Sequence, residues 1–261
     1  MSGEPRPIPT YPDLAGRVAL VTGGSKGIGA ATCRALAANG VRVAVNARSQ
    51  AGIDSVVAEL RGAGAEAIGI SADVGETAEI ERMRDLVHSG LGPIDILLPF
   101  AGGFGNFTPV EEISEREWRE VIEVNLTSTF LTVSAIVPSM IERRQGVIVT
   151  MSSNGGRYLD KLLTASYAAA KAGVIQFTRH VAKELGRYGI RANAIAPATV
   201  SSERIERIMD EPSRARVEEM SPLGTMGTPD DCALATLFLV SDSARWLTGV
   251  TLDISGGRIM L

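Results

Sequence analysis

The chain has 261 residues and a formal net charge of -4, with acidic and basic residues spread along the whole sequence. No basic cluster indicates a nucleic-acid partner, and the two cysteines and two histidines lack the spacing of metal ligands. No run reaches the roughly 18 apolar residues of a membrane helix. We therefore expect no nucleic acid, no membrane and no metal.

Composition favours one large α/β domain. Aromatic residues make up 5% of the chain, whereas alanine, valine, isoleucine and glycine are abundant, and a chain of this length can bury one full core. We expect an N-terminal arm over residues 1–13 and a single domain over 14–261. Cys33 and Cys232 lie in apolar helical patterns, which indicates buried free thiols and a cytoplasmic location.

The first motif is a glycine-rich turn between a strand and a helix. Arg17 to Val21 reads as a strand, an alanine-rich helix runs to about Asn39, and a second strand follows over 41–45. Strand, turn, helix and strand within about 30 residues form a mononucleotide-binding unit, in which glycines let backbone N–H groups approach a diphosphate. A tight loop without a ligand is the alternative. The expected cofactor contacts are Gly23, Ser25, Lys26, Gly27, Ile28 and Gly29.

The spacing of this turn, Thr-Gly-x-x-x-Gly-x-Gly, resembles the short-chain dehydrogenase/reductase family. The resemblance extends from about Leu14 to Met260 through several further motifs in the right order. It implies a single-domain Rossmann fold, with a doubly wound, seven-stranded parallel sheet and helices on both faces.

The end of the second strand predicts the cofactor. Family members that use NAD carry an aspartate at the position of Ala47, which binds the ribose hydroxyl and repels a 2′-phosphate. Here Arg48 follows, and Lys26 is in the glycine turn, so both cations are placed to face that phosphate. NADP(H) is therefore favoured over NAD(H), although both residues read equally as solvated surface cations.

A third strand over 67–70 leads to Asp73 and Val74, which the resemblance places beside the adenine. Asp73 has a second interpretation as the cap of the next helix, which is predicted to start near Thr77. A fourth strand, Asp95 to Leu98, precedes the residues in which the sequence departs from the family.

Relatives have Asn-Asn-Ala-Gly after the fourth strand, whereas this chain has Pro99-Phe100-Ala101-Gly102. Ala101 and Gly102 still allow close approach to the cofactor. The amides that brace the sheet in relatives are gone, and Pro99 lacks an N–H donor. We expect this junction to be locally rebuilt.

A capping box at Ser114 starts a long helix in which Asn125 lies on a mostly apolar stripe. A polar side chain there needs hydrogen-bond partners. By resemblance Asn125 is the catalytic asparagine that holds a water in a proton relay; a helix-packing amide is the alternative.

The catalytic serine of relatives lies about thirteen residues before the tyrosine. Ser153, which follows the strand Gly146 to Met151, lies fourteen residues before Tyr167. Aligning Ser153 with the family serine implies one inserted residue between Arg157 and Thr164. Ser152 is the adjacent alternative.

Tyr167 and Lys171 lie four residues apart in an alanine-rich run, so they share one face of a helix that extends to about Gly186. An ammonium beside a phenol favours the phenolate and lowers its pKa. An ordinary helix face is the alternative. By resemblance Tyr167 is the general acid, and Lys171 lowers its pKa and binds the cofactor ribose.

The strand Ile190 to Pro197 begins the last part of the site. The resemblance places Pro197, Val200 and Ser202 beside the nicotinamide, with Ala198 where relatives have glycine. It also implies a lid over about 200–221. A helix over 230–239 follows, and residues 252–257 close the chain as a seventh strand and tail.

The implied activity is NADPH-dependent reduction of a ketone, of the 3-oxoacyl type or related, to a secondary alcohol. The site would be Asn125, Ser153, Tyr167 and Lys171. The alternatives are an NAD(P)-dependent alcohol or sugar dehydrogenase and a non-catalytic dinucleotide-binding regulatory protein. Family resemblance further implies a homotetramer, packed through the helices after Ser114 and Ser166.

Overall fold

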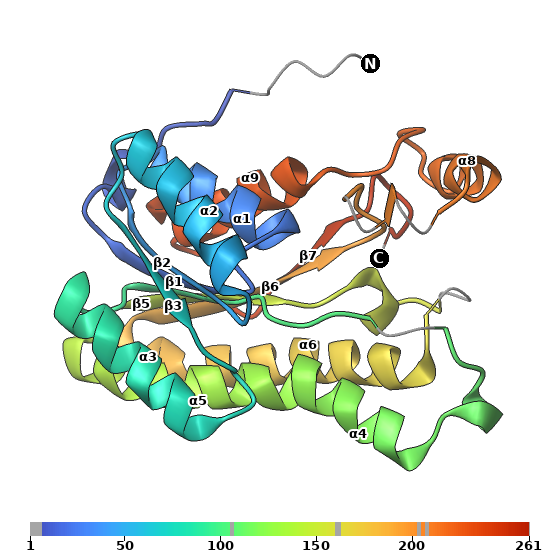
Figure 1. The fold of residues 1–261 in the computed structure, drawn as a ribbon, viewed down its shortest axis with the longest axis horizontal. Coiled ribbons are helices and arrows are strands. Elements are labelled where there is room, and N and C mark those ends of the chain that lie inside the picture. Colours follow the sequence, from blue (N-terminus) through green and yellow to red (C-terminus); the bar gives the residue numbers. More distant parts are fainter. Residues whose placement is uncertain (1–6, 105–106, 160–162, 203–204, 207–208, 261) are drawn as a thin grey trace.

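The structure is a computed structural model that describes residues 7–104, 107–159, 163–202, 205–206 and 209–260. Seven parallel strands form one sheet in the order β3-β2-β1-β4-β5-β6-β7 (Figure 1). This confirms the predicted doubly wound sheet. The strands are β1 (Val18–Thr22), β2 (Arg42–Ala47), β3 (Ala67–Ser71), β4 (Ile96–Pro99), β5 (Gly146–Met151), β6 (Ile190–Pro197) and β7 (Thr251–Ile254).

Helices cover both faces of the sheet (Figure 1). One face carries α1 (Gly27–Ala37), α2 (Gln50–Gly62) and α9 (Pro229–Val240). The other carries α3 (Thr77–Gly90), α5 (Ser128–Arg143) and α6 (Ala165–Leu185). Two further helices, α4 (Glu115–Ile122) and α8 (Glu211–Glu219), lie toward the carboxyl ends of the strands.

Burial on both faces explains why the central strands are continuously apolar. All five residues of β1 are buried, and the side chains of the sheet divide into two clusters, one under each helical layer. A parallel sheet covered on both faces requires such runs rather than alternating polarity. The helical layers cover the two faces of the sheet. The site is therefore formed by the carboxyl ends of the strands and the loops that follow them.

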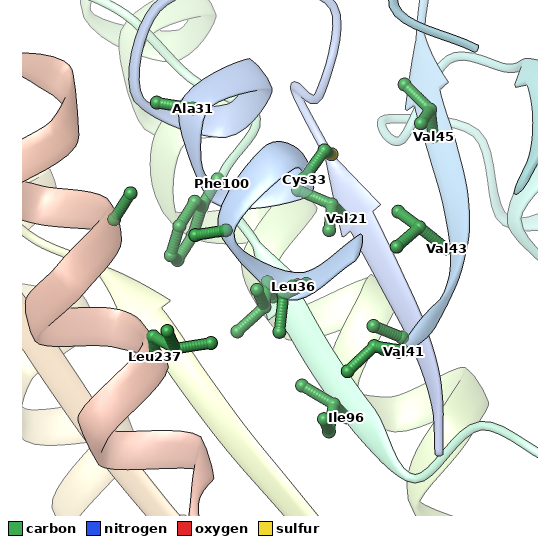
Figure 2. Close-up of a cluster of buried hydrophobic side chains, with 14 of the residues drawn as sticks. Val21, Ala31, Cys33, Leu36, Val41, Val43, Val45, Ile96, Phe100 and Leu237 are labelled. Carbon is green, nitrogen blue, oxygen red and sulfur yellow. The ribbon is translucent and has the colours of Figure 1, made fainter. Parts of the chain in front are cut away.

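The junction after β4 is apolar. Phe100 is 8% exposed and packs among residues of α1 and α9 (Figure 2). The Ala101 N–H donates to Thr22 Oγ1 at 3.1 Å, which ties the junction to the end of β1. Pairing between β4 and β5 involves only Ile96 and Leu97, so it stops before the end of β4. Packing by Phe100 therefore holds the segment in which relatives have amides.

The long helix predicted after Ser114 is interrupted. A π-helical turn, η3 (Glu123–Thr127), separates α4 from α5, and Ser114 Oγ accepts from Glu117 N as the capping box predicts. The stretch Glu115–Arg143 is long and apolar enough, by length and composition alone, to cross a membrane. The expectation that no segment meets this criterion was wrong, because the helix continues through the turn. Core helices of soluble proteins meet it as well.

Candidate active site

The glycine turn after β1 is shaped for close backbone approach. Gly23 and Gly27 have positive φ angles of 67° and 53°. A β-carbon on Gly29 would lie 2.2 Å from the Gly23 carbonyl oxygen, so this position admits only glycine. No side chain caps the first turn of α1. Its N–H groups and the helix dipole are therefore available to an anion, which fits the diphosphate of a dinucleotide.

The predicted specificity residues lie near this turn. Lys26 and Arg48 are both exposed, and no ion pair involves either of them in the part of the chain that the structure describes. Ser49 caps α2 by accepting from Gly52 N at 3.3 Å, which fixes the backbone directly after Arg48. Among the described residues, neither cation is therefore neutralised by an ion pair.

Asp73 closes a tight turn of its own. Its Oδ1 accepts from Gly75 N at 2.9 Å, and its N–H donates to Glu79 Oε2 at 2.6 Å. The residue before α3 is Glu76, and no side chain caps that helix. The alternative interpretation of Asp73 as a helix cap is therefore wrong, while the predicted start of the helix at Thr77 is right. Val74 beside it is buried.

Asn125 is fully buried in the π-helical turn and holds the loop after β4. Its Nδ2 donates to the carbonyls of Gly103 (2.9 Å) and Val121 (3.0 Å), and its Oδ1 accepts from Gly103 N (3.1 Å). A β-carbon on Gly102 would lie 2.7 Å from Asn125 Oδ1 and 3.4 Å from Lys171 Nζ. Gly102 therefore separates the amide from the ammonium, and all three groups share one small region.

The two candidate serines have different surroundings. Ser152 Oγ donates to the backbone carbonyl of Lys171 at 2.8 Å, which ties the end of β5 to α6. Ser153 is 7% exposed, and its hydroxyl lies beside the Tyr167 phenol, whose pKa it lowers. Ser153 is thus the serine that faces the tyrosine, and Ser152 is used in packing.

Tyr167 and Lys171 lie side by side, as their spacing predicts. Lys171 Nζ is 5.6 Å from the centroid of the Tyr167 ring and donates to the Met151 carbonyl at 2.9 Å. Burial lowers the pKa of Lys171 to about 8. Burial also raises the pKa of Tyr167 to about 12, against a smaller lowering by the Ser153 hydrogen bond. For the protein alone this direction is opposite to the expected lowering of the tyrosine pKa, because desolvation of the phenolate outweighs the effect of Ser153.

The last predicted contacts follow β6. Pro197 ends that strand, and Val200 forms an isolated bridge with Gly227. Ser202 Oγ accepts from Ile205 N at 3.4 Å. Within the predicted lid, α8 is described in full and Ile205 and Glu206 are helical, whereas residues 203–204 and 207–208 lie outside the described ranges.

Comparison with known proteins identifies the family. The short chain dehydrogenase family matches residues 17–212. The chain belongs to this family. Its members bind a nicotinamide dinucleotide and interconvert CH–OH and C=O groups, so the protein is an oxidoreductase of this type.

Individual relatives align with nearly the whole of this chain. A 3-oxoacyl-[acyl-carrier-protein] reductase of Synechocystis is 38% identical, covering 95% of this chain and 98% of its own. A D-threitol dehydrogenase of Mycolicibacterium smegmatis is 36% identical, covering 94% and 93%. A solved 3-oxoacyl-[acyl-carrier protein] reductase of Brucella melitensis with bound NAD has a TM-score of 0.92 at 32% identity, covering 100% and 98%.

Two side chains that belong to none of the predicted motifs also lie at this site. The ring of Phe104 meets the Tyr167 ring edge-on, with centroids 6.3 Å apart. Asn154 is 3% exposed, and its Oδ1 accepts from Ser153 Oγ at 3.3 Å. Its Nδ2 is buried without a hydrogen-bond partner among the described residues. The Ser-Asn-Gly-Gly segment was visible in the sequence, but only folding brings Phe104 to the tyrosine.

Proposed function

We propose that the protein is an NADPH-dependent ketoreductase in which Tyr167 is the general acid. The observation that carries the proposal is the buried Tyr167 phenol with the Ser153 hydroxyl beside it and Lys171 Nζ 5.6 Å from the centroid of the same ring. NADPH, when bound, supplies the hydride that reduces the carbonyl carbon. Tyr167 donates its phenolic proton to the carbonyl oxygen as negative charge develops there.

The neighbouring residues support that proton transfer. Ser153 donates a hydrogen bond to the same oxygen and stabilises its developing charge. The Lys171 ammonium stabilises the phenolate that Tyr167 leaves behind, and it binds the ribose of the cofactor. We assign to Asn125 the placement of Gly102 and Gly103 and the support of a water that returns a proton to Lys171.

We also propose that NADP(H) is favoured over NAD(H). Ala47 removes the carboxylate that would repel a 2′-phosphate, and Lys26 and Arg48 are exposed without acidic partners among the described residues. We expect Asp73, Val74, Ala101, Gly102, Pro197, Val200 and Ser202 to complete the contacts. Titration of the free enzyme with both cofactors tests this. Equal affinity for NAD, or an unchanged NADP affinity in Arg48→Ala, contradicts the assignment.

The substrate that we propose is a 3-oxoacyl compound or a related ketone. Similarity to a 3-oxoacyl-[acyl-carrier-protein] reductase over nearly the whole chain supports it. The second candidate is an alcohol or sugar dehydrogenase on the same scaffold, favoured by the similarity to a D-threitol dehydrogenase. Reduction of ethyl acetoacetate with NADPH, set against oxidation of D-threitol with NAD, separates the two.

The decisive experiment is Tyr167→Phe, which removes only the phenolic oxygen. Loss of a general acid typically costs about 10²–10⁴ in rate, so we expect turnover to fall by at least about 100-fold while NADPH binding, followed by fluorescence, is unchanged. Retained turnover contradicts the assigned acid. Absence of NADPH oxidation in the wild-type protein with any ketone favours a non-catalytic dinucleotide-binding protein.

We further propose a cytoplasmic homotetramer, with residues 14–261 as one folded unit. Large apolar side chains are exposed on the helical layer formed by α4, η3 and α5, namely Trp118 (42%), Val124 (38%) and Phe130 (48%). Packing between subunits would cover them. Sedimentation of a stable monomer at micromolar concentration contradicts this assembly.

A further inference from the structure

Arg157 joins the segment that carries Ser153 to the last strand of the sheet. Its Nη1 lies 2.5 Å from Asp253 Oδ2 and donates to the Thr251 carbonyl at 3.2 Å, although Asp253 is 96 residues away in sequence. The two side chains are only 19% and 18% exposed. A half-buried arginine that bonds both a carboxylate and a strand carbonyl restrains its own backbone more than a solvent-exposed pair does.

Ser153 and Arg157 are the two ends of one short turn. The 3-10 turn η4 (Asn154–Gly156) has Ser153 as its first flanking residue and Arg157 as its last. Arg157 N donates to the Asn154 carbonyl at 2.9 Å. Movement of Arg157 is therefore transmitted directly through a single turn of backbone to the serine.

The orientation of the Ser153 hydroxyl depends on that turn. Its oxygen accepts from Gly155 N at 3.2 Å, and it donates to Asn154 Oδ1 at 3.3 Å. Both partners belong to η4. On its other side the turn is packed against α6, because a β-carbon on Gly156 would lie 2.6 Å from the Lys171 carbonyl carbon. The turn is thus held between α6 on one side and β7 on the other.

Beyond Arg157 the chain leaves the sheet. Tyr158 and Leu159 are 55% and 92% exposed, and Thr164 caps α6. Arg157, which is bonded to β7, therefore directly precedes the exposed residues Tyr158 and Leu159. Without it, the described residues that would still hold the turn are those of α6 and β6 and Leu163, which packs against Gly155.

We propose that Arg157, through its pairing with Asp253, is a positioning residue that sets the place of the Ser153 hydroxyl beside Tyr167. Nothing in the catalytic proposal uses either residue, and Arg157 does not itself bond Ser153 or Tyr167. The inference rests on the proposed function, in which Ser153 stabilises the substrate oxygen. Its effect on the reaction must therefore pass through Ser153.

The test is a double-mutant cycle that uses ethyl acetoacetate as the probe at saturating NADPH. A misplacement of about 1 Å can cost about 100-fold in rate, so we expect Arg157→Met to lower kcat about 10- to 100-fold with a smaller change in KM. In a Ser153→Ala background the same substitution should change kcat by less than about 3-fold, since non-additivity is the signature of residues that act together. Equal losses in both backgrounds overturn the proposal.

Two further variants separate positioning from stability. Asp253→Asn breaks the pair from the strand side without touching the turn, and it should reproduce the kcat loss of Arg157→Met. Arg157→Lys keeps the charge and should recover part of the loss. The matched control is Arg143→Met, because Arg143 forms a comparably buried pair with Asp95 (2.7 Å, 25% and 14% exposed). It should lower the melting temperature but leave kcat within about 2-fold.

A structural readout does not depend on activity. In a crystal structure of Arg157→Met we expect η4 to shift away from β7 and the Ser153 hydroxyl to leave Tyr167. An unmoved turn overturns the positioning role. If the wild-type enzyme does not reduce the probe, the catalytic proposal for this ketone fails, and the crystal structure of the variant still decides whether Arg157 places Ser153.

Discussion

Gly102 offers a direct test of the site geometry, because it lies between Asn125 and Lys171. Its φ angle is 152°, a conformation that residues with a side chain rarely adopt. A β-carbon there would lie 2.7 Å from Asn125 Oδ1, well inside van der Waals contact. Gly102→Ala must therefore displace the asparagine or distort the loop after β4.

The unfolding free energy lost in Gly102→Ala has two contributions. A non-glycine residue in such a backbone conformation costs on the order of 1–3 kcal/mol. Displacement of the amide also breaks its two hydrogen bonds to Gly103, each worth about 1 kcal/mol. We expect Gly102→Ala to lose about 3–5 kcal/mol of unfolding free energy and about 100-fold in kcat, because the loop moves by a fraction of an ångström or more.

Urea denaturation and steady-state rates measure both effects, and two other glycines provide controls. Gly64 has a positive φ of 85° with nothing near its β-carbon position, so Gly64→Ala should lose only the backbone part, about 1–2 kcal/mol. Gly186 has a helical φ of -55° and open space, so Gly186→Ala should gain about 0.4–1 kcal/mol. Neither control should change kcat. If Gly102→Ala behaves like Gly64→Ala in both assays, the described contact with Asn125 is wrong.

Two further predictions concern charge. With a pKa of about 8 for Lys171, kcat/KM for NADPH should fall above pH 8. Above pH 8 the unfolded chain binds more protons than the folded chain, so the contribution of Lys171 to the unfolding free energy should rise between pH 8 and 10.5. Lys171→Met should abolish both trends, whereas the exposed Lys183→Met should abolish neither. Arg191 donates to the carbonyls of Leu239, Val240 and Ser241 at the end of α9, so Arg191→Met should cost about 2–4 kcal/mol without loss of kcat; an unchanged urea midpoint refutes this role.

The elements that follow from local pattern were predictable from the sequence. The β1 strand and its glycine turn, the capping box at Ser114 and the Tyr-x-x-x-Lys spacing each depend on neighbours within a few residues. The predicted strand ends agree with the structure to within one or two residues for β1 and β5. These local patterns predict the structure correctly because the apolar periodicity and the capping residues favour the same elements as the tertiary fold.

Contacts between distant segments were not predictable. The π-helical turn at Asn125 arises where α4 and α5 join, and no local residue signals it. The pair between Arg157 and Asp253 spans 96 residues, and each residue alone reads as a surface charge. The same holds for Phe100, whose place between α1 and α9 depends on a helix near the other end of the chain. Such contacts can be predicted only when the register of the whole sheet is known.

The electrostatics of the Tyr–Lys pair also depend on burial rather than on spacing. Tyr167 is almost fully enclosed, and its pKa of about 12 leaves about one molecule in 10⁵ as phenolate at pH 7. A protonated phenol is what the reduction of a ketone requires, whereas oxidation of an alcohol requires the base. In the proposed mechanism the rate of oxidation should therefore rise with pH over the range in which reduction stays level or falls. At neutral pH the buried phenol is thus in the protonation state that reduction uses, which the spacing of Tyr167 and Lys171 alone left undecided.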